Sequence, residues 1–285
     1  MPKVSVLMPV YKTEETYLRE TIESVLAQTF RDFEFLIIDD YPDDDREYII
    51  KSYNDARIKY FKNERNLGIT PTRNRLIDMA EGEYLAVIDH DDIAVPSRFE
   101  KQVAYLEQNP HVGVVSSWCD CFPEKVELHF PAEDLEIKKL LTDICALVHP
   151  ASMIRKSVLE EHNLRYEEEF SPAEDYCLWL RLIEFTNFHN IQEVLSKHRL
   201  YRENTTNKQW EKMQNATKIL HFWVRNKHHS LYKEYLKDRT LTIKTLLFGF
   251  IPLLRIKIQH NKTLVYLLNC IPIISIHKKV SSWPK

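Results

Sequence analysis

The chain has 285 residues, 44% of them hydrophobic and 28% charged, an ordinary composition for a soluble globular protein. Its four glycines are scattered, and neither G-x-G-x-x-G nor G-x-x-x-x-G-K occurs, so a phosphate loop of the Rossmann or P-loop kind is excluded. The net charge of −3 combines −15 over residues 1–207 with +12 over residues 208–285. The acidic body and the absence of a recognition motif argue against nucleic-acid binding.

Strand-like and helix-like segments alternate along the first 116 residues. Short apolar runs predict strands at 3–8, 33–38, 58–61, 84–88 and 112–116. The spacing of apolar residues between them predicts helices at 14–29, 44–54, 70–81 and 97–108. The runs lack polar alternation, which is typical of strands buried on both faces. The sequence therefore predicts an α/β fold with a mostly parallel sheet flanked by helices.

The pattern loosens beyond residue 117. Helices are predicted at 133–142, 156–162 and 173–186, and strands at 152–154 and 190–198. From 208 to 285 we expect a helical, basic, amphipathic extension. Its two apolar pieces, 245–254 and 263–276, are interrupted and shorter than the roughly 18–20 apolar residues that span a bilayer.

The extension suggests a task separate from that of the body. Cationic amphipathic segments lie in membrane interfaces and attract anionic lipids, so we expect it to bind an anionic membrane surface. The alternative is an extension that packs on the acidic body or forms a homodimer contact. The first residues, MPKVSVLMPVY, lack the form of a signal peptide, and the five cysteines lack zinc-like spacing. The expected location is therefore cytoplasmic, peripheral on the inner face of the cell membrane.

Two groups of carboxylates follow strand-like runs. Asp39-Asp40 end the second predicted strand, and Asp89, Asp91 and Asp92 end the fourth. Ligands of parallel sheets bind beyond the carboxyl ends of the strands, so both groups are expected in one crevice. Carboxylates gathered there favour Mn²⁺ or Mg²⁺, completed by water and a substrate diphosphate. The alternative, a cap for the helix that follows, explains Asp92 but not all three.

Five motifs resemble those of the family 2 glycosyltransferases, which have the nucleotide-diphospho-sugar transferase (GT-A) fold. In chain order they are VSVLMPVYK (4–12), SVLAQTFRDFEFLIIDD (24–40), NLGITPTRNRLI (66–77), EGEYLAVIDHDD (81–92) and AEDYCLWLRL (173–182). Five motifs in order are a far more specific signal than a lone D-x-D sequence. The resemblance implies a catalytic domain at 1–207, with a nucleotide-binding half at 1–117 and an acceptor-binding half at 118–207.

The resemblance also implies roles for the matching residues on the donor side. Pro9, Val10 and Tyr11 would line the nucleobase pocket, and Asp40 would meet the uracil edge. Arg73 would lie beside the nucleotide.

Further implied roles fall on the D-x-D and E-D motifs. Asp89 and Asp91, with His90 between them, would contact the ribose and the metal on the diphosphate, and Asp91 is the first choice of metal ligand. Asp175 would be the general base. The residue types suit this chemistry, because a metal stabilises a leaving diphosphate and a carboxylate can accept the proton of the acceptor hydroxyl. The alternative for Glu174 and Asp175 is an acidic first helical turn favoured by the helix dipole.

The chain departs from the family pattern at two places. Tyr41-Pro42 follow the paired aspartates where many relatives have Gly-Ser, which puts base recognition in doubt. Tyr201 stands where His is common, so it could help to hold the diphosphate or metal only through its hydroxyl. His198 could take the place of that His, or it packs beside the strand.

Other contacts with the donor or the acceptor are expected from a few further polar and aromatic side chains. They are Glu174, His149, Trp179 and Tyr201. For His149 and Trp179, the alternative is a place in the protein core.

The sequence thus predicts an inverting glycosyltransferase, because a single base with in-line displacement inverts the anomeric carbon. It would move a hexose or N-acetylhexosamine from a UDP-sugar to a hydroxyl of a lipid-linked saccharide, in the assembly of lipopolysaccharide or capsule. One alternative is a sugar nucleotidyltransferase, which would need a phosphate loop near the first strand. Another is a non-catalytic glycan-binding or scaffold protein with the same fold, against which Asp89, Asp91 and Asp175 argue.

Overall fold

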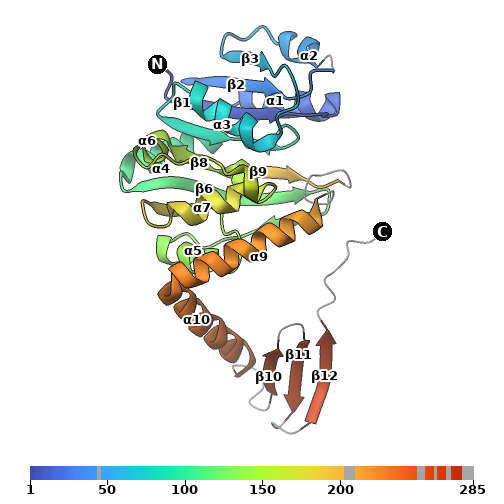
Figure 1. Ribbon diagram of the computed structural model, residues 1–285, viewed down its shortest axis with the longest axis vertical. Helices are drawn as coiled ribbons and strands as arrows, with labels where there is room; N and C mark the ends of the chain where they lie inside the picture. Colours follow the sequence, from blue (N-terminus) through green and yellow to red (C-terminus); the bar gives the residue numbers. More distant parts are fainter. Residues whose placement is uncertain (44–45, 202–208, 249–253, 260–261, 268–270, 278–285) are drawn as a thin grey trace. The chain divides into compact units, whose positions relative to one another are not determined.

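The computed structural model describes the chain apart from residues 44–45, 202–208, 249–253, 260–261, 268–270 and 278–285 (Figure 1). The chain divides into two compact units, residues 1–228 and 229–285. The domain boundary expected after residue 207 stays a prediction; the first compact unit runs 21 residues further and includes a helix of the predicted extension.

The first unit is built on one mixed sheet. Its strands are β1 (Val4–Val10), β2 (Phe33–Asp39), β3 (Ile58–Lys62), β4 (Tyr84–Val87), β5 (Ile93–Ala94), β6 (Val112–Phe122), β7 (Val126–Leu128), β8 (Met153–Arg155) and β9 (Asn187–Arg199). Across the sheet the order is β3-β2-β1-β4-β8-β6-β9-β5, with β7 beside β6. The first four strands pair in parallel, as do β6 and β9, whereas β8 is antiparallel to both β4 and β6. The predicted α/β fold is confirmed, and β5, β7 and β8 make the sheet mixed.

Helices cover this sheet. They are α1 (Glu15–Leu26), α2 (Glu47–Lys51), α3 (Ile69–Met79), α4 (Arg98–Gln108), α5 (Asp134–Leu141), α6 (Lys156–Glu161) and α7 (Glu174–Leu182), with the 3₁₀ turns η1 (His149–Ala151) and η2 (Glu168–Phe170). The helix α9 (Trp210–Lys227) packs on α7 and η2. Each helix predicted within the body is present. The largest differences are α2, which has five residues, and α7, which ends at Leu182.

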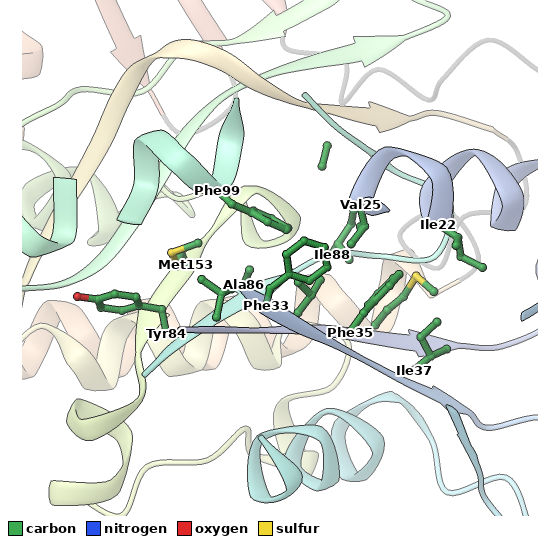
Figure 2. Close-up of a cluster of buried hydrophobic side chains, with 14 of the residues drawn as sticks. Ile22, Val25, Phe33, Phe35, Ile37, Tyr84, Ala86, Ile88, Phe99 and Met153 are labelled. Carbon is green, nitrogen blue, oxygen red and sulfur yellow. The ribbon is translucent and has the colours of Figure 1, made fainter. Parts of the chain in front are cut away.

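The main core lies between the parallel strands and the helices α1 and α4 (Figure 2). Alternate residues of each strand enter it, because side chains of a strand point to opposite faces in turn. Phe33 of β2 and Phe99 of α4 meet edge to face there, with ring centroids 5.8 Å apart, and Ile22 and Val25 of α1 belong to the same cluster. The helix α3 packs on β1 and β2. Burial on both faces explains why these strands read as continuous apolar runs.

The order of the strands places the site. Strands β2 and β4 lie on opposite sides of β1, and all three run in the same direction. Their carboxyl ends therefore meet at one edge of the sheet, next to the point where the strand order reverses. Crevices at such a switch point are the ligand sites of open α/β sheets.

The second unit contains α10 (His229–Phe248), β10 (Leu254–Gln259), β11 (Lys262–Leu267) and β12 (Ile271–His277). The three strands form an antiparallel sheet in the order β10-β11-β12. The prediction of helix throughout 208–285 was right for α9 and α10 and wrong for these strands. The run LRIKIQ at 254–259 alternates apolar with polar residues, a period of two that favours a strand. None of the helices in the described residues is long and apolar enough to cross a membrane.

Candidate active site

One arginine joins two of the sequence motifs. Arg73 lies on α3, and its Nη2 donates to Asp89 Oδ1 at 2.9 Å while its Nη1 donates to Glu174 Oε1 at 2.6 Å. Asp89 follows β4, and Glu174 is the first residue of α7. Burial alone would raise the pKa of Asp89, but the Arg73 guanidinium outweighs it and holds that pKa at about 2. The D-x-D and E-D motifs therefore face each other across a single guanidinium.

A tyrosine holds the second aspartate of the D-x-D motif. The hydroxyl of Tyr201 donates to Asp91 Oδ2 at 2.6 Å. Burial and the Asp91 carboxylate raise the pKa of this phenol, so it stays a donor at neutral pH. The Tyr201 hydroxyl is thus bonded to Asp91, and its expected part in holding the diphosphate or metal stays a prediction.

The third aspartate of the cluster pairs with a histidine. Asp92 is fully buried, and His198 Nδ1 lies 3.0 and 3.1 Å from its two carboxylate oxygens. The backbone N–H of Arg199 also donates to Asp92. Burial raises the pKa of Asp92 to about 6, while Asp92 overcomes the effect of burial on His198 and raises its pKa to about 9. The alternative role of Asp92 as a cap for the following helix is wrong, because α4 begins without a side-chain cap and Asp92 anchors β9 instead.

Asp175 lies at the beginning of α7, one residue after Glu174. Its Oδ1 accepts the backbone N–H of Tyr176 at 2.7 Å, and its side chain is only partly buried. Burial, then the neighbouring Glu174 carboxylate, raise the pKa of Asp175 to about 6. A partly exposed carboxylate with this pKa is ionised at neutral pH and retains appreciable basicity.

Three of the four expected contacts with donor or acceptor are buried instead. Glu174 is 2% exposed and pairs with Arg73, so the expected ligand contact of Glu174 is wrong. Trp179 on α7 is 0% exposed, which leaves no ring face for a sugar, so the stacking role is wrong and the core alternative holds. His149 is also buried, and its Nε2 lies 2.8 Å from the hydroxyl of Tyr166. Burial and the nearby Arg73 charge hold the pKa of His149 well below its usual value. The expectation that His149 faces the donor or the acceptor is therefore wrong as well.

The end of β1 presents one exposed aromatic side chain. Pro9 and Val10 are buried within the strand, whereas Tyr11 is 40% exposed. Its ring meets the ring of Tyr41 edge-on, with centroids 5.4 Å apart. The Lys12 ammonium lies 4.6 Å from the centroid of Tyr41 and 5.2 Å from that of Tyr11. Of the three residues expected to line a nucleobase pocket, only Tyr11 offers a surface for a base.

Asp40 carries out a structural task. Its carboxylate accepts the backbone N–H groups of Leu67 and Gly68, each at 2.8 Å, and the side-chain amide of Asn63 at 2.7 Å. Gly68 has φ of 89°, a left-handed conformation that glycine tolerates, and it directly precedes α3. Asp40 therefore anchors the turn that precedes α3, the helix that carries Arg73.

The histidine of the D-x-D motif is held by a threonine. Thr13 Oγ1 lies 2.7 Å from His90 Nδ1.

The carboxylates at the end of β4 suit a hard divalent cation. Asp89 and Asp91 offer oxygen ligands, which Mg²⁺ and Mn²⁺ prefer. Among the described residues, no three His, Cys, Asp or Glu side chains gather closely enough to enclose a metal by themselves. Mg²⁺ is characteristically held by one or two carboxylates and completed by substrate phosphates and water, so the donor set fits such an ion.

The profile of the family described as Glycosyl transferase family 2 matches residues 5–162 of the sequence. This stretch includes most of β1, the strands β2 to β4, the D-x-D motif and the helix α3 that carries Arg73. The chain belongs to glycosyl transferase family 2. It is accordingly a glycosyltransferase.

Two curated relatives of this family 2 glycosyltransferase extend the match. An uncharacterized glycosyltransferase of Methanocaldococcus jannaschii is 37% identical over 246 residues, which cover 78% of this chain and 84% of the relative. WfgD of Escherichia coli, a UDP-Glc:alpha-D-GlcNAc-diphosphoundecaprenol beta-1,3-glucosyltransferase, is 26% identical over 232 residues, or 80% of this chain and 89% of the relative.

Solved structures share the fold of this glycosyltransferase at low sequence identity. Residues 1–349 of Staphylococcus aureus TarS, in complex with UDP-GlcNAc, superpose with a TM-score of 0.64 at 20% identity over 75% of this chain and 65% of that one. The mannosyltransferase PcManGT of Pyrobaculum calidifontis, with GDP-Man and Mn²⁺, gives a TM-score of 0.56 at 13% identity over 88% and 81% of the two chains. The GT-A fold is thereby confirmed.

One residue of the glycosyltransferase site escaped prediction. The ring of Tyr166 lies 5.8 Å from the Arg73 guanidinium, and its backbone pairs with Asn74 through two hydrogen bonds. Tyr166 belongs to no motif and lies 92 residues from Asn74. Local sequence carries no signal for such a contact.

Proposed function

We propose that this family 2 glycosyltransferase moves a hexose or N-acetylhexosamine from a UDP-sugar to a saccharide hydroxyl, with inversion at the anomeric carbon. The observation that carries the proposal is the bridge from Asp89 through Arg73 to Glu174, because it brings the motif for the donor next to the helix that bears Asp175. Two similar proteins support the donor class: WfgD is named for UDP-Glc, and TarS was solved with UDP-GlcNAc.

On the donor side, the exposed Tyr11 would stack on the nucleobase. Asp91 and Asp89 would hold Mn²⁺ or Mg²⁺, which would offset the charge that develops on the leaving diphosphate. Tyr201 fixes one oxygen of Asp91 and so orients the carboxylate. The Mn²⁺ in the similar PcManGT structure supports this choice of ion.

On the acceptor side, Asp175 would remove the proton of the attacking hydroxyl. Its pKa of about 6 leaves it ionised at neutral pH. The hydrogen bond from Tyr176 N–H occupies Oδ1, which leaves Oδ2 as the candidate proton acceptor. A single carboxylate base opposite the leaving group gives one displacement, and one displacement inverts configuration.

Release of UDP from a panel of UDP-sugars, with saccharide acceptors and Mn²⁺ or Mg²⁺, tests the proposal. We expect Asp175→Asn to lose at least about 100-fold in kcat while it retains affinity for UDP, since general base catalysis contributes 10²–10⁴-fold. Asp134→Asn is the matched control, because Asp134 is an acidic residue in the first turn of α5 and should leave turnover unchanged. Unchanged turnover of Asp175→Asn would remove Asp175 as the base, and UDP binding without transfer would favour a glycan-binding protein.

The proposal also covers the class of acceptor and the attachment of the enzyme to a membrane. WfgD is named for a diphosphoundecaprenol-linked acceptor, which supports a lipid-linked acceptor. We place the enzyme in surface-glycan assembly on the cytoplasmic face of the membrane. The +12 charge of residues 208–285 supports attachment to anionic lipid. The full chain should sediment with anionic vesicles at low salt and not with zwitterionic ones. Equal recovery with both kinds of vesicle would contradict the electrostatic attachment, and sedimentation equilibrium of the same sample would test the homodimer.

A further inference from the structure

We infer that Arg73 is a positioning residue that ties the donor-side carboxylate Asp89 to the helix bearing the base, and that it does not contact the nucleotide. The inference rests on the proposed function for the identity of the base. It replaces the nucleotide contact implied by family resemblance with a role inside the protein. Glu174 shares the role, because it connects Arg73 to the residue before Asp175.

The contacts of Arg73 are directed at the protein. Its two Nη atoms donate to Asp89 and Glu174, and the whole residue is 9% exposed. Its Nε is buried without a hydrogen-bond partner among the described residues. A guanidinium in this position has little surface to offer a ligand.

Aromatic packing supports the guanidinium. The centroid of the Tyr166 ring lies 5.8 Å from it, and His149 Nε2 lies 2.8 Å from the Tyr166 hydroxyl. The ring of Trp179 is tilted against that of His149, with centroids 5.9 Å apart. These buried rings limit the positions open to the Arg73 guanidinium. The packed core therefore helps to keep it between the Asp89 and Glu174 carboxylates.

The bridge spans a large sequence separation. Arg73 and Glu174 are 101 residues apart, and they come from α3 and from α7. Arg73 lies in the predicted nucleotide-binding half, and Glu174 lies in the predicted acceptor-binding half. A displacement of about 1 Å in the reacting groups is enough to slow an enzyme strongly, so the ion pair can set the rate without touching a substrate.

Burial makes the charges of Arg73 and Glu174 depend on each other. Glu174 is nearly inaccessible, and its second oxygen, Oε2, is buried without a hydrogen-bond partner among the described residues. Without Arg73, this carboxylate would be a buried charge with no compensation, which is costly. Removal of both charges should be less harmful than removal of one, because no unpaired charge remains.

A double-mutant cycle on turnover tests the inference. Arg73→Met and Glu174→Leu should each lower kcat by about 50-fold or more, whereas the Kd for UDP with Mn²⁺ should stay within about threefold of wild type. The double variant should be no slower than the slower single variant. Arg73→Lys should restore part of kcat, since it keeps the charge but reaches one carboxylate at a time. Arg165→Met is the matched control, because Arg165 pairs with Asp78 at the surface.

Three outcomes would overturn the inference. A loss of UDP affinity beyond about tenfold in Arg73→Met, with normal affinity in Glu174→Leu, would make Arg73 a nucleotide contact. Additive losses in the double variant would show that the residues act separately. Normal turnover of Glu174→Leu would remove the bridge from catalysis.

If the wild type transfers no sugar, the proposed function fails, and coupling between Arg73 and Glu174 in urea unfolding still tests the bridge. Additive stabilities would then overturn it. If Arg73→Met or Glu174→Leu does not fold, Arg73→Lys and Glu174→Gln supply the same cycle with smaller changes in volume.

Discussion

The hydroxyl of Tyr201 donates a 2.6 Å hydrogen bond to Asp91, from 110 residues further along the chain. Removal of that hydroxyl should loosen the carboxylate that we propose as the metal ligand. Because hydrogen bonds to charged groups contribute about 1.5–3 kcal/mol, Tyr201→Phe should lose tenfold or more in apparent Mn²⁺ affinity. Titration of UDP release with Mn²⁺ measures this loss. Tyr53→Phe, which loses an exposed hydrogen bond to Glu23, is the matched control; equal metal affinity of the two variants would contradict the prediction.

The rate of transfer should depend on pH through Asp175. The pKa of about 6 means that the base is protonated below pH 6 and ionised above it, so kcat should fall about tenfold per pH unit on the acid side. Glu174 raises that pKa, so Glu174→Gln should move the acid limb to lower pH, and its residual activity should be less sensitive to acid. Profiles of kcat against pH at saturating donor measure the acid limb of the wild type and that of Glu174→Gln. An acid limb at the same pH in Glu174→Gln as in the wild type would contradict the prediction that Glu174 raises the pKa of the base.

Trp179 should contribute to stability and not to acceptor binding. Trp179→Ala should lower the free energy of unfolding by about 3–5 kcal/mol, the usual cost of a large cavity in a core. Urea unfolding measures this change, and Trp210→Ala on the exposed start of α9 is a control that should cost much less. A rise in acceptor KM with unchanged stability would restore the sugar-stacking role.

Gly82 should resist even the smallest substitution. A Cβ there would lie 2.5 Å from Ser5 N and 2.7 Å from Val4 C, so the backbone of β1 would have to move. Gly82→Ala should therefore destabilise the protein by about 3 kcal/mol or more, since overpacking against backbone cannot relax by rotation of a side chain. Gly113→Ala meets side chains of Thr186 and Val158 and should cost less. Thermal unfolding of the two variants compares them, and the reverse order would contradict the prediction.

The sequence determined the elements of the catalytic body and the places of its charged motifs. Apolar runs bounded by turns predicted β1 to β4, because parallel strands buried on both faces need continuous apolar side chains. The aspartates after β2 and β4 followed from the same pattern, since parallel strands end at one edge of the sheet. The order of the five motifs predicted the family. In the second unit the period of two at 254–259 was present but was outweighed by the apolar composition, so β10 was missed.

Only the tertiary structure decided the partners of the three aspartates. Asp89 bonds to Arg73, Asp91 to Tyr201 and Asp92 to His198, at separations of 16, 110 and 106 residues. Local sequence could not predict these pairs, because chain packing brings their members together. Packing also buried His149 and Trp179, which their residue types alone had left open between ligand and core. Periodicity specifies local structure, whereas the burial and pairing of single side chains depend on distant segments that share the same volume.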